Sequence, residues 1–130
     1  MPNTRPFCSV IVLNYNGALV LEQNLQALFE QEYPKSLFEI IVVDNCSQDT
    51  SREILEQYRK KYPQLLKPLY LDKNYGFGEG NNRGVLAAQG KYVALLNNDC
   101  VADSTWHSTL VSSAKKDEKI NADKSKVLLF

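Results

Sequence analysis

The sequence has no excess of either charge, few cysteines, a single histidine and no long hydrophobic run. Its 15 Lys and Arg residues balance its 15 Asp and Glu residues, so the formal net charge is zero. This balance argues against a nucleic-acid-binding protein that relies on bulk positive charge, and against a strongly basic protein of the membrane surface. The longest apolar runs, such as Tyr92–Leu96, are far too short to cross a bilayer. Residues 1–7 lack the charged segment and the apolar run of a signal peptide, so we expect none.

The cysteines and the histidine argue against several kinds of chemistry. Cys8, Cys46 and Cys100 are widely spaced and form no CxxC pattern. We therefore expect neither a disulfide framework nor a zinc site, but small buried residues in a reducing compartment. His107 stands next to Trp106 in an expected helix, and we interpret it as a surface or boundary residue rather than a catalytic one. With a single histidine, a Ser/His/Asp or Cys/His catalytic set is not expected.

What remains is the composition of one ordinary globular domain. Hydrophobic residues make up 44% and charged residues 23% of the 130 residues, which is too apolar for a disordered chain. A chain of this length buries roughly two thirds of its unfolded surface, so it can form a core without disulfides or metal. We therefore treat residues 1–130 as a single domain.

Short β-branched runs alternate with amphipathic stretches along the chain. Strands are expected at Cys8–Leu13, Phe38–Val43, Leu66–Leu71, Tyr92–Leu96 and Val127–Phe130. Between the first two, Leu21, Leu25 and Leu28 recur at helical spacing, and a capping box at Thr50–Glu53 is expected to begin the second helix. This alternation predicts an α/β fold with a doubly wound, mostly parallel sheet and helices on both faces.

Polar residues follow each of the first four expected strands. In chain order they are Asn14 and Asn16, Asp44 and Asn45, Asp72 and Asn74, and Asn97, Asn98 and Asp99. Parallel sheets bind ligands at the carboxyl ends of their strands, so we expect these side chains to share one edge of the sheet. Two carboxylates among amides, Asp44 and Asp99, could hold a hard divalent cation that bridges phosphate oxygens. Tyr15 could face a planar base, although packing within the turn explains it equally well.

The glycine-rich segment Asn74–Gly84 lacks the spacing of the common phosphate motifs. A dinucleotide fingerprint that begins at Gly76 needs glycine at position 81, where the sequence has Asn81. A Walker A loop that ends at Gly90 and Lys91 needs glycine at position 85 and Ser or Thr at position 92, where the sequence has Val85 and Tyr92. We expect a glycine-rich loop, then a helix with a C-cap at Gly90. Such a loop can bring backbone close to a ligand, but a turn that needs positive φ is an equally good interpretation.

Four segments stand out as a set: SVIVLNYNG (9–17), IIVVDNCSQDTS (40–51), NYGFGEGNNRG (74–84) and GKYVALLNNDCV (90–101). Together they resemble the inverting glycosyltransferases of family 2, which have a GT-A nucleotide-sugar-binding fold, and among them the bacterial rhamnosyltransferase-like members. The resemblance covers nearly the whole chain, in the expected order and spacing. It implies that residues 1–130 are the N-terminal, nucleotide-sugar-binding part of a GT-A domain, without the acceptor-binding half.

The resemblance implies that the first two segments bind the nucleoside. The exit of the first strand, at Asn14 and Tyr15, would touch it, and Asp44 or Asn45 would recognise a pyrimidine base. Family members often have two acidic residues there, so Asn45 leaves the base open between uracil and thymine. The loop Asn74–Gly84 would cover the ribose and the diphosphate. As a set, the residues expected to bind the nucleotide sugar are Asn14, Tyr15, Asn16, Asp44, Asn45, Asn74, Gly76, Gly80, Asn81, Arg83, Asn97 and Asn98.

The segment Asn97–Asp99 occupies the place of the family's DxD metal motif. Asp99 is its only carboxylate, so it would be the metal ligand, and the donor diphosphate would supply most of the other oxygens around Mg²⁺ or Mn²⁺. The reaction implied is inverting transfer of a sugar from a UDP- or dTDP-linked donor to a glycan or lipid-linked acceptor, in cell-surface polysaccharide biosynthesis. The metal or Arg83 would stabilise the departing diphosphate. The general base would lie beyond Phe130, so we expect donor binding with little or no transfer.

Other classes of protein stay open on the residues alone. A non-catalytic module would bind the sugar nucleotide without turnover. A receiver-type phosphoacceptor domain has a similar small sheet, but it needs an acidic pair after the first strand, where this chain has Asn14 and Asn16. A nucleotidyltransferase usually has a basic glycine-rich loop at that place. We expect no membrane span and a cytoplasmic protein, with peripheral association at the inner face of the cell membrane as the alternative.

Overall fold

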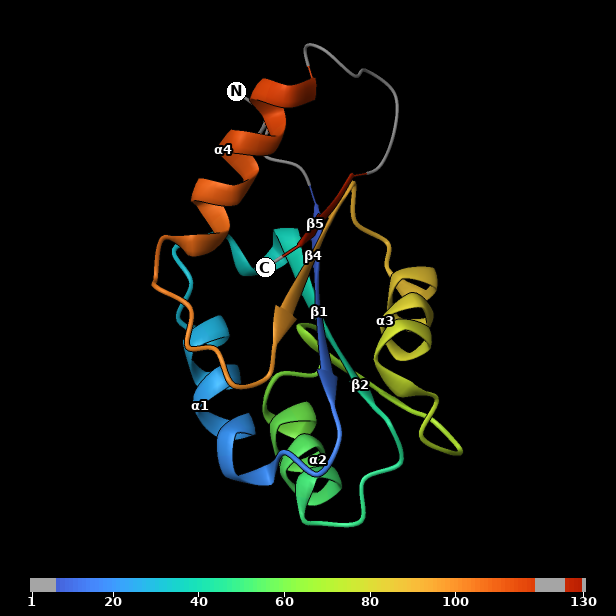
Figure 1. Ribbon diagram of the computed structural model, residues 1–130. Coiled ribbons are helices and arrows are strands. Elements are labelled where there is room, and N and C mark those ends of the chain that lie inside the picture. The colour runs from blue at the N-terminus through green and yellow to red at the C-terminus, as the bar shows by residue number, and fades with distance from the viewer. Residues whose placement is uncertain (1–6, 119–125, 130) are drawn as a thin grey trace.

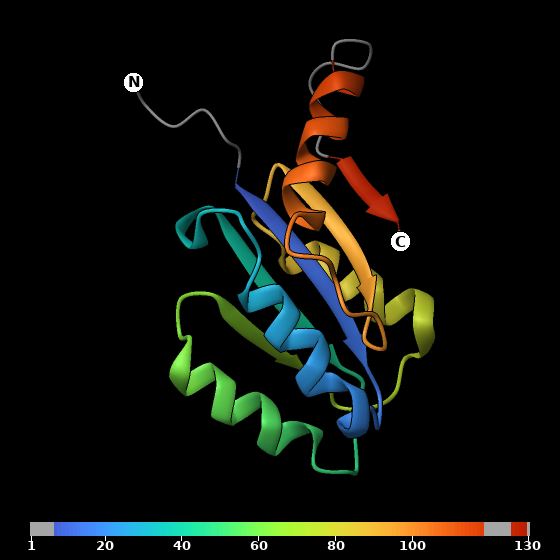
Figure 2. The same ribbon diagram turned by 90° about the vertical axis from the view of Figure 1, so that its left-hand side faces the viewer.

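In the computed structural model, which describes residues 7–118 and 126–129, five parallel strands form one sheet. The strands are β1 (Cys8–Asn14), β2 (Phe38–Asp44), β3 (Leu66–Tyr70), β4 (Tyr92–Asn97) and β5 (Lys126–Leu129). Their order is β3-β2-β1-β4-β5, and Figure 2 shows them side by side. The chain moves outward from β1 to β3 and then crosses back to β4, on the other side of β1. The carboxyl ends of β1 and β4 therefore border the point at which the strand order reverses.

Helices cover both faces of this sheet, as the sequence predicts. They are α1 (Ala18–Phe29), α2 (Ser51–Lys61), α3 (Gly76–Ala87) and α4 (Trp106–Glu118), with a 3₁₀ turn, η1, at Lys35–Leu37. Figure 1 views the sheet along its edge, with α1, α2 and α4 on one side and α3 on the other. Val10 and Val12 of β1 point into the core under α1, whereas Ile11 points into the core under α3. β1 and β2 are buried on both faces, which explains why their sequences lack polar alternation.

The outer strands also agree with the sequence analysis. β3 is an edge strand and contains Pro68, which pairs with Val42 of β2. An edge tolerates proline because one side of the strand needs no donor for a neighbour. At the other end of the sheet, β5 pairs with β4 in parallel, from Tyr92 opposite Lys126 onward. Phe130, the last residue of the expected fifth strand, lies outside the described residues.

The segment predicted as a glycine-rich loop is mostly helix, so that prediction was wrong. α3 begins at Gly76, which has φ +85, and runs to Ala87. Gly80 and Gly84 lie one turn apart on the side that packs against the sheet. A Cβ at Gly80 would come within 2.6 Å of Leu13 Cδ1, and one at Gly84 within 2.6 Å of Ile11 Cγ2. These glycines allow the helix and the sheet to approach closely.

Two predicted helix caps were also wrong. Thr50 precedes α2, but its side chain makes no capping hydrogen bond; Asp49 accepts the Ser51 N–H at 2.9 Å instead. A carboxylate is the stronger acceptor for an amide at a helix N-terminus. α3 ends before Gly90, at an extended Ala88. Gly90 instead packs closely against the backbone of β1, where a Cβ would come within 2.5 Å of the Ser9 nitrogen.

His107 is buried, so its interpretation as a surface or boundary residue was wrong. Its side chain is 3% exposed, and its ring stacks on Tyr33 with the centroids 4.3 Å apart. The edge of Phe38 lies against the same ring at 4.8 Å. Burial lowers the pKa of His107 to about 4, so the ring is neutral at pH 7. The residue packs α4 onto the core through partners that are distant in the sequence.

The state of the cysteines and the length and polarity of the helices can also be compared with the sequence analysis. Within the part of the chain that the structure describes, Cys8, Cys46 and Cys100 form no disulfide, and burial raises the pKa of the Cys8 thiol to about 11. Cys46 and Cys100 are half-buried rather than buried. Over the same residues, every helix is too short or too polar to span a bilayer.

Candidate functional site

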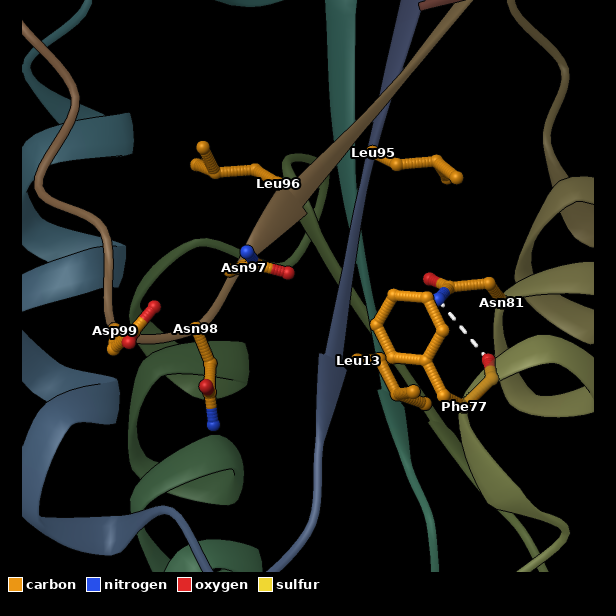
Figure 3. Close-up of a pocket in the computed structure, with 8 residues that line it drawn as sticks. All are labelled: Leu13, Phe77, Asn81, Leu95, Leu96, Asn97, Asn98 and Asp99. Carbon is orange, nitrogen blue, oxygen red and sulfur yellow. Dashed lines mark hydrogen bonds between the residues drawn. The ribbon is translucent and has the colours of Figure 1, made fainter. Parts of the chain in front are cut away.

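A pocket of about 560 Å³ opens where the carboxyl ends of β1 and β4 face the first turns of α3. Its lining residues, shown in Figure 3, are Leu13, Phe77, Asn81, Leu95, Leu96, Asn97, Asn98 and Asp99. In this view the segment Asn97–Asp99 lies on one side and Phe77 and Asn81 of α3 lie on the other. The pocket stands at the reversal of strand order, where parallel sheets bind their ligands. It offers polar groups along one wall and apolar surface, including an aromatic ring, elsewhere.

The polar wall is a tight turn at the end of β4. The Cys100 N–H donates to the Asn97 carbonyl at 3.1 Å and closes the turn. Asp99 is exposed on this turn, at the pocket. Asn24 of α1 holds the turn from the opposite side through its side-chain amide, which donates to the carbonyls of Asn97 and Cys100. The only carboxylate of the pocket is therefore carried by an ordered turn.

A chain of hydrogen bonds joins the ends of β4, β1 and β2 next to the pocket. Asn98 Nδ2 donates to Asn14 Oδ1 at 2.9 Å, and Asn14 Nδ2 donates to Asp44 Oδ1 at 3.0 Å. Asp44 is fully buried and also accepts the Ser47 N–H, the Ser47 hydroxyl and Arg52 Nε. A buried carboxylate needs such donors to offset the loss of water. This network therefore fixes the three strand ends relative to one another.

Asp44 and Asp99 thus do not share one pocket. Asp99 is exposed at the pocket, whereas Asp44 lies outside the lining and is joined through Asn14 to the lining residue Asn98. The expectation that both carboxylates hold one cation was therefore wrong, because internal donors surround Asp44. Across residues 7–118 and 126–129, no three His, Cys, Asp or Glu side chains cluster as a metal site.

Asn45 ties the end of β2 to the beginning of α3. Its Oδ1 accepts the Tyr75 N–H at 3.1 Å, and its Nδ2 donates to the Gly76 carbonyl at 3.0 Å. Asn74 Oδ1 accepts the Gly76 N–H at 2.8 Å, which orders the same turn. These predicted binding residues lie outside the pocket lining, and their side chains shape the entry into α3.

Of the two α3 residues predicted to contact the diphosphate, the structure places Asn81 in the pocket and Arg83 outside its lining. The Asn81 side chain donates to the Phe77 carbonyl one turn earlier, at 3.1 Å. Arg83 pairs with Glu79 at 3.0 Å, and its guanidinium lies 3.8 Å from the centre of the Tyr75 ring. Two residues along a helix correspond to a rotation of about 200°, so Asn81 and Arg83 project from different sides.

The exit of β1 is joined to the loop after β2. Asn16 has φ 50; its N–H donates to Ser47 Oγ at 2.9 Å, and its Oδ1 accepts the Gln48 N–H at 2.8 Å. Tyr15 beside it is 48% exposed and lies outside the pocket lining.

Of the residues predicted to bind the nucleotide sugar or the metal, the structure brings four into the pocket, namely Asn81, Asn97, Asn98 and Asp99. The predicted residues outside the lining are Asn14, Tyr15, Asn16, Asp44, Asn45, Asn74, Gly76, Gly80 and Arg83.

Several residues of the site did not come from the sequence analysis. Phe77 lines the pocket and is 69% exposed. The sequence signal that could have pointed to it is its position between two glycines. Asn24 interrupts the apolar face of α1, and a polar residue on a buried helical face is such a signal. Arg52 and Ser47 left no local signal, since their partner Asp44 becomes their neighbour only through the fold.

The donor atoms of the pocket suit a hard divalent cation. The Asp99 carboxylate and the amides of Asn97 and Asn98 offer oxygen, and Mg²⁺ and Mn²⁺ prefer oxygen ligands. A single carboxylate supplies few of the ligands that such an ion needs. A cation would therefore depend on oxygens that a bound phosphate group brings.

These features define a fold of the GT-A, nucleotide-diphospho-sugar transferase type, and solved structures agree. Staphylococcus aureus TarS 1–349 in complex with UDP is 34% identical, with a TM-score of 0.73 over 87% of this chain and 32% of that chain. The mannosyltransferase PcManGT from Pyrobaculum calidifontis in complex with GDP-Man and Mn²⁺ is 27% identical, with a TM-score of 0.77 over 92% of this chain and 33% of that chain. The expected fold is confirmed.

Residues 9–125 match the model of Glycosyl transferase family 2, and the chain belongs to this family. Glycosyltransferase AglE of Haloferax volcanii is 38% identical over 113 residues, which are 87% of this chain and 37% of that protein. The putative teichuronic acid biosynthesis glycosyltransferase TuaG of Bacillus subtilis is 37% identical over 99 residues, 76% of this chain and 38% of that protein. The chain thus spans somewhat more than a third of the length of these relatives.

Proposed function

We propose that the chain binds the nucleotide-diphosphate sugar donor of a glycosyltransferase that builds a cell-surface glycan with inversion at the transferred sugar. The observation that carries this proposal is the pocket at the ends of β1 and β4, with Asp99 exposed on its polar wall. Family membership supports sugar transfer, and TuaG, named for teichuronic acid biosynthesis, supports a cell-surface product. We further propose that the protein is cytoplasmic, with peripheral association at the inner face of the cell membrane as the alternative.

The diphosphate would lie between the Asn97–Asp99 turn and the beginning of α3. Phe77 and Asn81 line the pocket from the first turns of this helix, and a helix N-terminus favours anionic groups through its N–H groups and its dipole. Asp99, with the amide oxygens of Asn97 and Asn98, would hold Mg²⁺ or Mn²⁺. When bound, the ion supplies charge neutralisation for the departing diphosphate. The chain's own residues orient the donor and hold its charged groups in place.

We propose a uridine or thymidine donor, with UDP favoured. TarS, whose structures are named with UDP and with UDP-GlcNAc, is 34% identical, compared with 27% for the protein named with GDP-Man. Tyr15, half exposed at the exit of β1, is the candidate for contact with the base. The rhamnosyl preference implied by the resemblance stays a prediction.

The acceptor site and the general base are proposed to lie outside the matched third of the relatives. The relatives are almost three times as long as the region that they share with this chain. We therefore expect residues 1–130 to bind the donor and to transfer sugar poorly by themselves. Rapid metal-dependent transfer by these residues alone would contradict this division.

The test is a thermal-shift panel of UDP, dTDP and GDP, each with and without Mn²⁺. We expect UDP to stabilise the protein in the presence of Mn²⁺; a ligand at a hundred times its Kd adds about 2.7 kcal/mol. Asp99→Asn should lose this stabilisation. Asp103→Asn is the matched control, since Asp103 is exposed in the same connection and lies outside the pocket lining. No nucleotide-dependent shift, or an unchanged shift in Asp99→Asn, would contradict the proposal.

A further inference from the structure

Asn24 is a fully buried carboxamide in the middle of α1. Its neighbours on the buried face of the helix, Leu21, Leu25 and Leu28, are all 0% exposed. Burial of an amide among apolar side chains costs free energy unless its polar atoms are paired. Asn24 Nδ2 donates at 3.1 Å to the Asn97 carbonyl and at 2.9 Å to the Cys100 carbonyl, while its Oδ1 has no partner among the described residues. Both hydrogen bonds that Asn24 donates are thus made to one turn, Asn97–Cys100.

The two carbonyls that Asn24 holds flank Asn98 and Asp99. The Asn97 carbonyl also accepts the Cys100 N–H, so the four residues form a closed turn with both ends tied to α1. The direction of the two central residues of a turn depends on the placement of the outer two. Figure 3 shows Asp99 where the chain bends away from the end of β4. α1 therefore holds the backbone of the turn that carries Asp99.

A second buried carboxamide provides an internal comparison. Gln31 lies seven residues after Asn24 and is 3% exposed. Its Nε2 donates to the Asp103 carbonyl at 2.6 Å, and its Oε1 accepts the His107 N–H at 2.9 Å. Gln31 thus holds a later part of the same connection and makes no bond to the Asn97–Cys100 turn.

We propose that Asn24 is a positioning residue for the metal ligand Asp99, acting through the Asn97–Cys100 turn without touching the nucleotide. This inference rests on the proposed function, because it gives Asn24 a part in metal-dependent binding of the donor. Loss of the two hydrogen bonds releases the turn, and the carboxylate then samples directions that do not serve a cation held by the diphosphate.

The experiment compares Asn24→Leu, which has a similar size and no donor, with Gln31→Leu. Titration calorimetry measures the affinity for UDP with and without Mn²⁺. In Asn24→Leu we expect unchanged affinity for UDP alone, whereas the gain from Mn²⁺ falls by about 10- to 100-fold, as for other residues that orient metal ligands. In Gln31→Leu the gain in UDP affinity from Mn²⁺ should stay within about twofold of that of the unmodified protein, because Gln31 does not orient the metal ligand. Asn24→Ala, which removes the carboxamide and adds no bulk or charge, repeats the test if Asn24→Leu does not fold.

Hydrogen exchange of the Cys100 amide provides a readout that needs no ligand. We expect this amide to be protected in the unmodified protein and in Gln31→Leu, and to lose protection in Asn24→Leu while the β4 amides keep theirs. The inference would be overturned if Asn24→Leu kept the full gain in UDP affinity from Mn²⁺, or if Gln31→Leu lost as much of that gain. It would also be overturned if the Cys100 amide stayed protected in Asn24→Leu. If the unmodified protein gains nothing from Mn²⁺, the proposed function fails, and the exchange result still decides whether Asn24 orders the turn.

Discussion

Gly84 is the position at which one methyl group tests how closely α3 packs on the sheet. A Cβ there would lie 2.6 Å from Ile11 Cγ2 and 2.8 Å from Val43 Cγ2, where ordinary contact begins at 3.4 Å. Both partners are fully buried β-branched residues of β1 and β2, so neither moves aside without disturbing the sheet. Overpacking of this kind costs about 1–3 kcal/mol, against a gain of about 1 kcal/mol for alanine over glycine in a helix. We therefore expect Gly84→Ala to lower the free energy of unfolding.

Gly78→Ala is the matched control on the same helix, because a Cβ built at Gly78 has no atom within 4 Å apart from its chain neighbours and the backbone of its own helix. It should stabilise the protein by up to about 1 kcal/mol through helix propensity alone. The difference between the two variants then isolates the overpacking cost, about 1–3 kcal/mol. Urea unfolding followed by circular dichroism measures it. Equal unfolding midpoints for Gly84→Ala and Gly78→Ala would refute the close packing of α3.

Three further predictions concern other parts of the molecule. Stability should fall by about 2 kcal/mol from pH 7 to pH 5, because unfolded His107 takes up a proton near its ordinary pKa of 6.5 while the buried ring, with a pKa of about 4, does not. The His107→Phe variant should lack this pH dependence in urea unfolding; a protein whose stability is flat over that range would contradict the burial. Glu39→Gln should cost about 1–3 kcal/mol in the same assay, since the carboxylate is 1% exposed and accepts from Lys67 at 2.8 Å; a cost below about 0.5 kcal/mol would show that this network matters little. Gly17→Ala should break the bond between Asn98 and Asn14, because a Cβ would collide with both side chains; an unshifted Asn98 side-chain amide signal in NMR spectra would argue otherwise.

The strands could be predicted because burial on both faces leaves a local record. The run Phe38–Val43 is apolar and β-branched, and β2 extends only one residue further. The beginning of α3 could not be predicted in this way, since glycines disfavour an isolated helix. Gly80 and Gly84 become favourable only against Leu13 and Ile11, which lie far away in the sequence. Tertiary packing, rather than local preference, decides that segment.

The site shows the same division between local and tertiary information. The order of strands and polar exits predicts one edge of the sheet, and the pocket with Asn97, Asn98 and Asp99 lies there. Which polar residues turn inward depends on partners that the sequence does not reveal. Asp44 is surrounded by donors from Asn14, Ser47 and Arg52 and therefore stays buried. Asp99 meets no such set of donors from other strands and remains exposed at the pocket.

The most direct test of the nucleotide-diphosphate site uses the paramagnetism of Mn²⁺, which broadens the NMR signals of nearby nuclei. Mn²⁺ is added to the isotope-labelled protein in the presence of UDP, and the amide signals are compared with those in UDP and Mg²⁺. We predict broadening of the amides of Asn81, Asn98 and Cys100, centred on Asp99, with the signals of Leu37 and Lys91, which precede the amino ends of β2 and β4, unchanged. Broadening centred on another part of the molecule, or equal broadening without UDP, would contradict a donor-dependent metal site at Asp99.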